Sequence, residues 1–162
     1  MESFPRAGFR RRMGSYLYDF LLAIAVYMCA GFLSFAVFGY LFNEGAINNQ
    51  GFEHATDLLQ HSLLYSFLIY GWNLFWVGFF FVYFWVKSGQ TISMRAWRLR
   101  VQNQDGTRIS ATTGLTRLVF SLFGLGNLLV IFDRKNKLSL QDRMTKTEVV
   151  VLTIEENRAA MG

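Results

Sequence analysis

FLLAIAVYMCAGFLSFAVFGYLF, which occupies residues 20–42, contains no Asp, Glu, Lys or Arg. Residues 62–86 form a second apolar run without a charge. Each run is longer than the roughly 20 residues that a helix needs to cross a hydrocarbon core. The sequence therefore predicts an all-α membrane protein with two transmembrane helices, and we expect residues 1–162 to form a single domain.

The composition agrees with a membrane protein and excludes several other classes. Hydrophobic residues make up 52% of the 162 residues, and the mean hydropathy is +0.25. The first apolar run is too long for the roughly 7–15-residue core of a signal peptide, and no A-x-A site follows it. We therefore expect the first segment to remain attached to the chain.

No motif in the chain points to catalysis, and we expect no enzyme, cofactor or metal. The single cysteine, Cys29, excludes an intramolecular disulfide or a CxxC site. A P-loop, a GxGxxG fingerprint, an HExxH motif and a Ser-His-Asp arrangement are all missing from the sequence. His54, Asp57 and His61 would share one face of a helix, but a solvated loop is the favoured interpretation of this segment.

The positions of the basic residues predict the orientation. The sixteen Lys and Arg fall within residues 6–12, 87–117 and 134–158, and none lies in residues 43–61, which carry Glu44, Glu53 and Asp57. By the positive-inside rule this loop is outside and the N-terminus is cytoplasmic. The net charge of +5 then predicts contact with anionic lipid headgroups and not with nucleic acid.

A third apolar stretch, residues 118–132, is too short for a standard span and contains the sequence Gly-Leu-Gly-Asn at residues 124–127. Basic clusters flank it on both sides, which disfavours a complete crossing. We expect a re-entrant or interfacial helical hairpin with both ends in the cytoplasm. The competing topology is a short third span that places the C-terminus outside.

Two segments after the second span predict a small cytoplasmic β element. Residues 97–102 alternate large apolar with polar side chains before the turn signal Asp105-Gly106, and residues 148–154 are rich in β-branched residues. Both segments are expected on the same side of the membrane, so they are expected to pair. Residues 153–162 are expected to form a frayed tail beyond the core at residues 7–152.

Small and polar residues predict the faces through which the spans contact protein. Ala30 and Ser34 of the first run lie near one helical stripe, and the second run offers Gly71, Asn73 and Gly78. Transmembrane helices use such residues to approach one another closely, and we expect Asn73 to make an interhelical hydrogen bond. The same stripes make a homo-oligomer an expectation.

Asp19 is the most informative charge, because it stands at the start of the first apolar run. A carboxylate at the membrane centre costs ~2.5–3.5 kcal/mol on insertion scales, and less near an interface. Arg12 lies on the same helical face but ~10 Å away along the axis. A bridge through a third group is therefore expected. Asp133 and Asp142, by contrast, are typical of a solvated turn.

Three ordered motifs, at residues 7–19, 89–106 and 132–150, together resemble the RDD family of small bacterial membrane proteins. Residues 7–19, which contain Arg11-Arg12 and Asp19, resemble that family's opening motif, and residues 89–106, with Gly89-Gln90-Thr91 and Asp105-Gly106, resemble its middle motif. Phe132-Asp133 and residues 140–150 resemble its end. The likeness covers about residues 7–152.

The resemblance implies a functional cluster and a location in the bacterial inner membrane, with several spans. The arginine and two aspartates that name the family correspond to Arg12, Asp19 and Asp142, with Asp133 as the reserve for the second aspartate. The family's usual His and Gly are replaced here by Gln141 and Ser93. The family analogy implies transport of a monovalent cation or a proton; the alternative is an accessory protein in which the cluster is a structural clamp.

Overall fold

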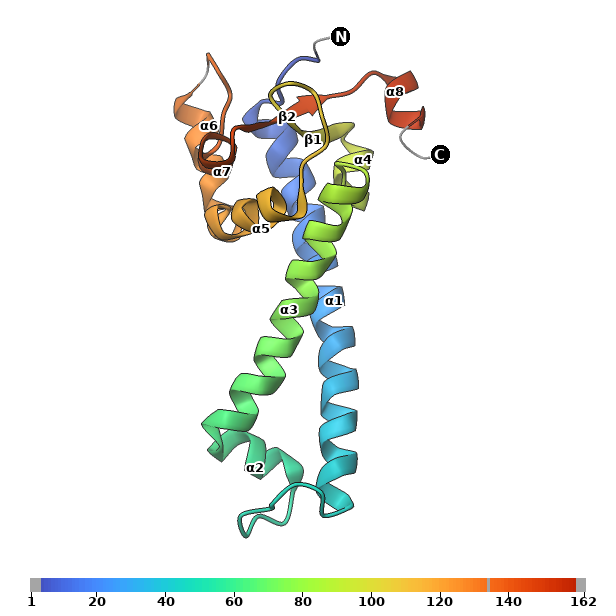
Figure 1. Cartoon of the computed structure of the whole chain (residues 1–162), viewed down its shortest axis with the longest axis vertical. Helices are drawn as coiled ribbons and strands as arrows, with labels where there is room; N and C mark the ends of the chain where they lie inside the picture. The colour runs from blue at the N-terminus through green and yellow to red at the C-terminus, as the bar shows by residue number, and fades with distance from the viewer. Residues whose placement is uncertain (1–3, 134, 160–162) are drawn as a thin grey trace. The chain divides into compact units, whose positions relative to one another are not determined.

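The computed structural model describes residues 4–133 and 135–159 of the chain (Figure 1). In chain order the elements are α1 (Phe9–Asn43), α2 (Ala55–His61), α3 (Leu63–Lys87), α4 (Ile92–Ala96), β1 (Leu99–Asn103), α5 (Ala111–Phe120), the 3-10 helix η1 (Leu122–Leu128), α6 (Leu129–Phe132), α7 (Leu140–Thr145), β2 (Thr147–Val151) and α8 (Ile154–Ala159). The chain is mostly helical with one small sheet, as the sequence predicts.

Two helices, α1 and α3, are long and apolar enough to cross a membrane. The 35 residues of α1 extend over roughly 52 Å, so its first turns continue beyond the apolar run. α5 and the segment Gly124–Phe132 are also apolar, but they meet at an angle of 81°. The two predicted helices are confirmed as candidate spans, while their crossing of a membrane and the re-entrant hairpin stay predictions.

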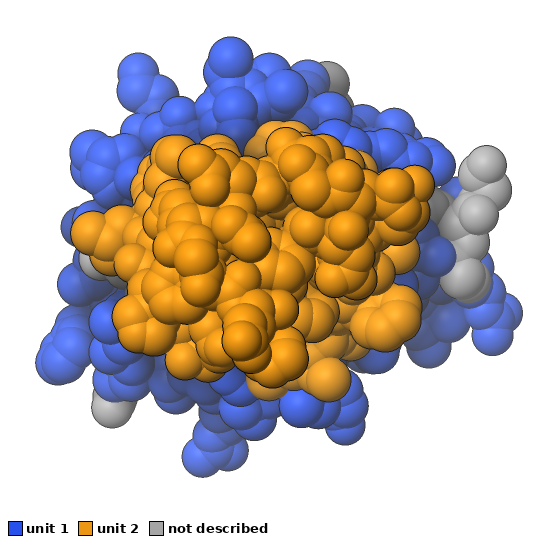
Figure 2. Space-filling model, turned by 90° about the horizontal axis from the view of Figure 1, so that it is seen from below, with its two compact units in different colours: residues 1–22, 78–162 blue, residues 23–77 orange. Residues whose placement is uncertain are grey.

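The chain divides into two compact units, which Figure 2 shows in different colours. Unit 1 consists of Met1–Leu22 and Gly78–Gly162, and unit 2 consists of Ala23–Val77. Both apolar helices contribute to each unit. The expectation of a single folding domain stays a prediction.

Unit 2 is held together at one end by apolar packing and along its helices by one polar contact. Phe38, Leu58 and Leu59 form a buried cluster through which α2 contacts α1. Further along, Ser34 Oγ donates a hydrogen bond of 3.0 Å to Asn73 Oδ1. This bond confirms the interhelical role predicted for Asn73, whose side chain is buried.

In unit 1, β1 and β2 form the expected antiparallel pair, with Leu99 opposite Val151 and Asn103 opposite Thr147. The chain before α1 continues the sheet, because the Ala7 amide donates to the Val149 carbonyl at 2.8 Å. The predicted strand pairing is confirmed. Most of the predicted strand ends lie within one or two residues of the observed ends. The assignment of this sheet to the cytoplasm stays a prediction.

The C-terminal tail is more ordered than predicted. Residues 154–159 form helix α8 where the sequence indicated the end of a strand and a frayed tail. Asn157 anchors this helix: its Oδ1 accepts a hydrogen bond of 2.9 Å from Gln90 Nε2, and its Nδ2 donates to the Arg95 carbonyl at 3.2 Å. A short-range pattern could not reveal partners that lie some sixty positions earlier. Residues 160–162 of the predicted tail lie outside the described residues.

The first turns of α1 pack into the core of unit 1. Ala7, Leu99, Val101 and Val149 are buried in one apolar cluster. Gly14 faces the ring of Trp97 so closely that a side chain at position 14 would overlap it. This contact brings the charged start of α1 beside the sheet and α7.

Candidate functional site

Asp142 is fixed by the way α7 begins. Ser139 is the N-cap residue: its Oγ accepts a hydrogen bond from the Asp142 amide at 3.3 Å, and the Ser139 amide donates to Asp142 Oδ2 at 3.1 Å. This reciprocal capping box satisfies two amides that a helix start leaves without partners. It also points the carboxylate of Asp142 into the interior, where its side chain has no exposed surface.

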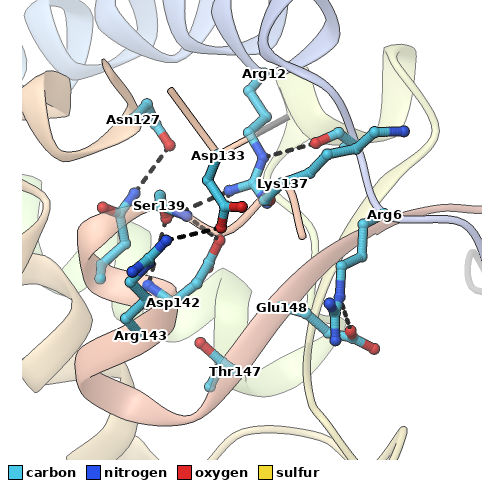
Figure 3. Close-up of polar contacts among 12 residues, drawn as sticks. Arg6, Arg12, Asn127, Asp133, Lys137, Ser139, Asp142, Arg143, Thr147 and Glu148 are labelled. Carbon is cyan, nitrogen blue, oxygen red and sulfur yellow. Dashed lines mark hydrogen bonds and ion pairs between the residues drawn. The ribbon is translucent and has the colours of Figure 1, made fainter. Parts of the chain in front are cut away.

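Arg12 of α1 reaches this carboxylate from a position 130 residues away in sequence (Figure 3). Its Nη1 donates to Asp142 Oδ2 at 2.7 Å. Its Nε donates to the Ala7 carbonyl at 3.1 Å and its Nη2 to the Lys137 carbonyl at 2.9 Å. The guanidinium group therefore ties the start of α1 to α7 and to the loop before it.

Arg117 of α5 approaches the other oxygen of the same carboxylate. Its Nη1 lies 2.8 Å from Asp142 Oδ1 and also donates to Thr147 Oγ1 of β2. Its guanidinium carbon lies 5.8 Å from the centre of the Trp85 ring, which is a cation–π arrangement. The sequence interpretation missed Arg117. A signal was present, because Arg117 is the one charge in residues 109–132 and needs a partner.

We call Arg12, Arg117 and Asp142 the clamp. The side chains of the two arginines are 3% exposed, and that of Asp142 is 0% exposed. Burial by itself would raise the pKa of Asp142, but the charges of Arg117 and Arg12 and the bonds from Ser139 outweigh it and hold this pKa below its ordinary value. Asp142 is therefore ionised. Its placement in a solvated turn from the local residues is wrong, whereas the grouping of Asp142 with Arg12 that the resemblance implies is observed as an ion pair.

Asp19 is not part of the clamp. Its side chain is buried, and its Oδ2 accepts a hydrogen bond of 3.4 Å from Ser15 Oγ. The hydroxyls of Thr91 and Ser93, at the start of α4, lie close to the same carboxyl group. Its Oδ1 has no hydrogen-bond partner among the described residues, nor has Ser93 Oγ. The expected bridge between Arg12 and Asp19 is therefore missing from the described part of the chain, and we call this second group the Asp19 site.

Asp133 pairs with neither arginine of the clamp among the described residues, and its side chain is only 10% exposed. Its Oδ1 accepts a hydrogen bond of 3.0 Å from the Asn136 amide, and its Oδ2 lies 2.8 Å from Arg143 Nη2. The backbone bond from Asn136 and the bond from Arg143 lower the pKa of Asp133. Because the Arg143 side chain is 52% exposed, this pair contributes little to stability. The geometry makes Asp142, and not Asp133, the partner of Arg12.

The two positions that depart from the resembling motifs both lie beside these groups. Ser93 adds a hydroxyl next to Asp19, where a glycine would add none. Gln141, which precedes Asp142, donates from Nε2 to Asn127 Oδ1 at 2.9 Å, and its Oε1 has no described partner. Among the described residues no group of three or more His, Cys, Asp or Glu is placed to hold a metal ion.

The fold and the clamp define the class as a small membrane protein with two apolar helices and a buried arginine–aspartate cluster. Comparison with protein families then gives one match, the RDD family, over residues 6–146, and the chain belongs to this family. No curated protein and no solved structure matches the chain.

We predict that Asp142→Ala destabilises the protein more than Arg12→Ala does. Removing one partner of a buried ion pair typically costs ~3–5 kcal/mol, because the other charge is left uncompensated. Loss of Asp142 leaves two buried arginines with like charges. The free energy of unfolding, measured by denaturant titration in detergent micelles, should fall further for Asp142→Ala than for Arg12→Ala. The double variant should lose less of this free energy than the sum of the two single losses.

Arg143→Ala is the matched control, because it removes an arginine from an exposed pair in the same region. Its cost should stay within ~1 kcal/mol. Equal effects of Arg12→Ala and Arg143→Ala would show that the clamp does not hold the segments together.

Proposed function

We propose that the protein is a transport component that binds and releases a proton or a monovalent cation at Asp19, while the clamp is structural. The observation that carries this proposal is the buried Oδ1 of Asp19, which has no described hydrogen-bond partner beside the hydroxyls of Ser15, Thr91 and Ser93. This division combines the two roles that the sequence leaves open and assigns each to a different aspartate.

The Asp19 site suits an exchangeable positive charge. A buried carboxylate without a counter-charge is costly, so it takes up a proton or binds a cation. No ion pair with Asp19 occurs in residues 4–133 or 135–159. Hydroxyl and carboxylate oxygens are ligands that hard cations accept, and an ionisable residue near a span is a functional candidate.

The clamp does not suit this task. Both oxygens of Asp142 already accept charged hydrogen bonds at 2.7 and 2.8 Å. A cation that approached Asp142 would have to displace an arginine and would meet the positive charge of the other. Arg12, the arginine nearest to Asp19 along α1, is already paired with Asp142. Asp19 therefore has no guanidinium partner there and can exchange a proton or a cation.

We predict that Asp19→Asn abolishes ion-coupled proton flux without destabilising the protein. Purified protein in liposomes that enclose a pH-sensitive dye would be exposed to Na⁺ or K⁺ gradients. The variant should behave as protein-free liposomes do. Its free energy of unfolding should equal or exceed that of the wild type, because the substitution removes a buried charge that has no counter-charge among the described residues.

Asp133→Asn is the matched control, since it neutralises an aspartate outside the Asp19 site whose partner Arg143 is exposed, and it should keep full flux. Flux retained by Asp19→Asn would contradict the role of Asp19. A wild-type protein that moves no cation or proton in this assay would favour the alternative, a non-transporting accessory protein whose clamp has only a structural role.

We also propose that the protein lies in the bacterial inner membrane as a multi-pass protein, with its N-terminus, unit 1 and its C-terminus in or facing the cytoplasm. The charge distribution supports this orientation. Arg10 and Arg11 are exposed at the start of α1 and suit contact with anionic headgroups on that side. In this topology the third apolar stretch is re-entrant and does not cross.

Cysteine labelling in a Cys29→Ser background tests this orientation. Glu53 and Glu155 are exposed, so Glu53→Cys and Glu155→Cys report on the loop and on α8 with little disturbance. An impermeant maleimide should modify Glu53→Cys in intact cells and Glu155→Cys only after lysis. External labelling of Glu155→Cys would establish a complete third span.

A homo-oligomer is part of the proposal, because two spans by themselves cannot enclose a pathway. The small-residue stripe suggested by the sequence is partly used within the chain: Ser34 bonds to Asn73, and Gly78 contacts Leu118. An apolar groove of about 1070 Å³ in unit 2 is the better candidate surface. It is lined by residues of α1 and α3, among them Ala25, Cys29, Ala30, Leu33 and Trp72.

We predict that Cys29→Trp, which places a bulky ring in this groove, shifts the mass of the protein in nanodiscs towards that of one copy. Met28→Trp is the matched control, because Met28 is exposed on α1 but does not line the groove. Native mass measurement should show more than one copy for the wild type and for Met28→Trp. A single copy of the wild type in both detergent and nanodiscs would remove this part of the proposal.

A further inference from the structure

The segment from α5 to α6 exposes an apolar surface without a charge. Arg117 is its one charged residue between Arg108 and Asp133, and that side chain is turned inward. Leu115, Val119, Leu125 and Phe132, in contrast, are 56, 69, 64 and 83% exposed. Soluble proteins rarely leave a contiguous apolar patch of this kind in water.

The bend in the segment argues against a complete crossing of the bilayer. A straight helix of residues 111–132 would extend over roughly 33 Å, enough for the ~30 Å hydrocarbon core. α5, however, has 10 residues, or roughly 15 Å, and the next arm turns away from it by 81°. Gly124 provides the turn with a φ of +96°, a value that suits glycine, and it packs against the Tyr16 ring.

The contacts of α5 with α3 define a depth. A methyl group added at Gly78 would lie 3.0 Å from Leu118, and one added at Gly114 would lie 3.2 Å from Val82. Gly78 and Val82 precede the end of α3 at Lys87 by roughly 14 and 8 Å along the helix. Half of a hydrocarbon core is ~15 Å thick. Both of these contacts between α5 and α3 therefore lie within the half-membrane nearest Lys87.

The contact with α1 agrees with this depth. Tyr16, which packs on Gly124, follows the start of α1 at Phe9 by roughly 10 Å. The charged ends of the segment also stay on one side. Arg108 donates to the Lys87 carbonyl at 2.7 Å, and Asp133 pairs with Arg143 of α7.

We infer that the outward face of α5, η1 and α6 lies among the acyl chains of one leaflet, as an interfacial hairpin that the clamp anchors through Arg117. This face, which we call the leaflet surface, consists of Leu115, Val119, Leu125, Leu128, Leu129, Ile131 and Phe132. Its partner is lipid and not a protein. An interfacial helix has an apolar face that enters one half of the membrane and charged residues at its ends, and this segment has both features. The inference does not depend on the Asp19 site.

The test is depth-dependent quenching in liposomes. Val119→Cys, in a Cys29→Ser background, would carry a bimane fluorophore, and the lipids would carry a nitroxide either near the headgroup or at the chain end. Gln104→Cys is the matched control, because Gln104 is exposed in unit 1 but outside the leaflet surface. The nitroxide lipids should quench bimane at position 119 and spare it at position 104, while aqueous iodide should do the reverse.

Leu115→Cys and Phe132→Cys extend the test to the two ends of the surface, so that the failure of one variant to fold leaves others to measure. Both should be quenched by lipid within the same leaflet. Quenching of position 119 by iodide as strongly as position 104 would overturn the inference. Protection of position 119 from both quenchers would also overturn it, because this result would indicate a protein partner. Placement of positions 115 and 132 in opposite leaflets would do the same, because it would indicate a crossing.

Discussion

The carboxylate of Asp142 between two arginines is the interaction on which the architecture of unit 1 depends. It joins the start of α1, the middle of α5 and the start of α7, which are far apart in sequence. Taking these groups out of water is costly, and the arrangement offsets this cost because both oxygens of Asp142 and all three side-chain nitrogens of Arg12 have partners, whereas Arg117 Nε has none among the described residues. The carbonyls of Ala7 and Lys137 and the ring of Trp85 offset the charge that a single carboxylate cannot balance.

This interaction also explains why Asp19 and Asp142, which lie in two different motifs of the family, have different electrostatic environments. Arg12 is shared with no other carboxylate among the described residues, so Asp19 has hydroxyl neighbours in place of a guanidinium. The two aspartates compete for the guanidinium of Arg12, and Asp142 pairs with it. Sequence distance does not decide this, since Asp19 is much closer than Asp142 to Arg12 along the chain. The capping box of α7 preorganises Asp142 for the ion pair, and Asp19 has no comparable device.

Local patterns predicted much of the fold, and long-range electrostatics was the part they could not reach. The two spans follow from uncharged runs, the strand pair from β-branched residues, and the bond of Asn73 from the cost of a lone amide in a membrane. Arg117 was missed because its partner lies 25 positions away on an element whose helical start only the structure reveals. For the same reason Asp142 looked solvated from its local residues, and only the resemblance to the family grouped it with Arg12. The order of α8 likewise depends on remote partners of Asn157.

A charged anchor has a particular value beside a membrane. In water, burial of an apolar face orients an amphipathic helix, but lipid tails are as apolar as a protein core and give no such preference. For α5, burial of its apolar side therefore does not by itself decide whether that side faces protein or lipid. Arg117 removes this ambiguity, because only one rotation brings it to Asp142 and keeps its charge out of the hydrocarbon. Since the same rotation turns Leu115 and Val119 outward, the clamp that stabilises unit 1 also determines which face of α5 meets the lipid.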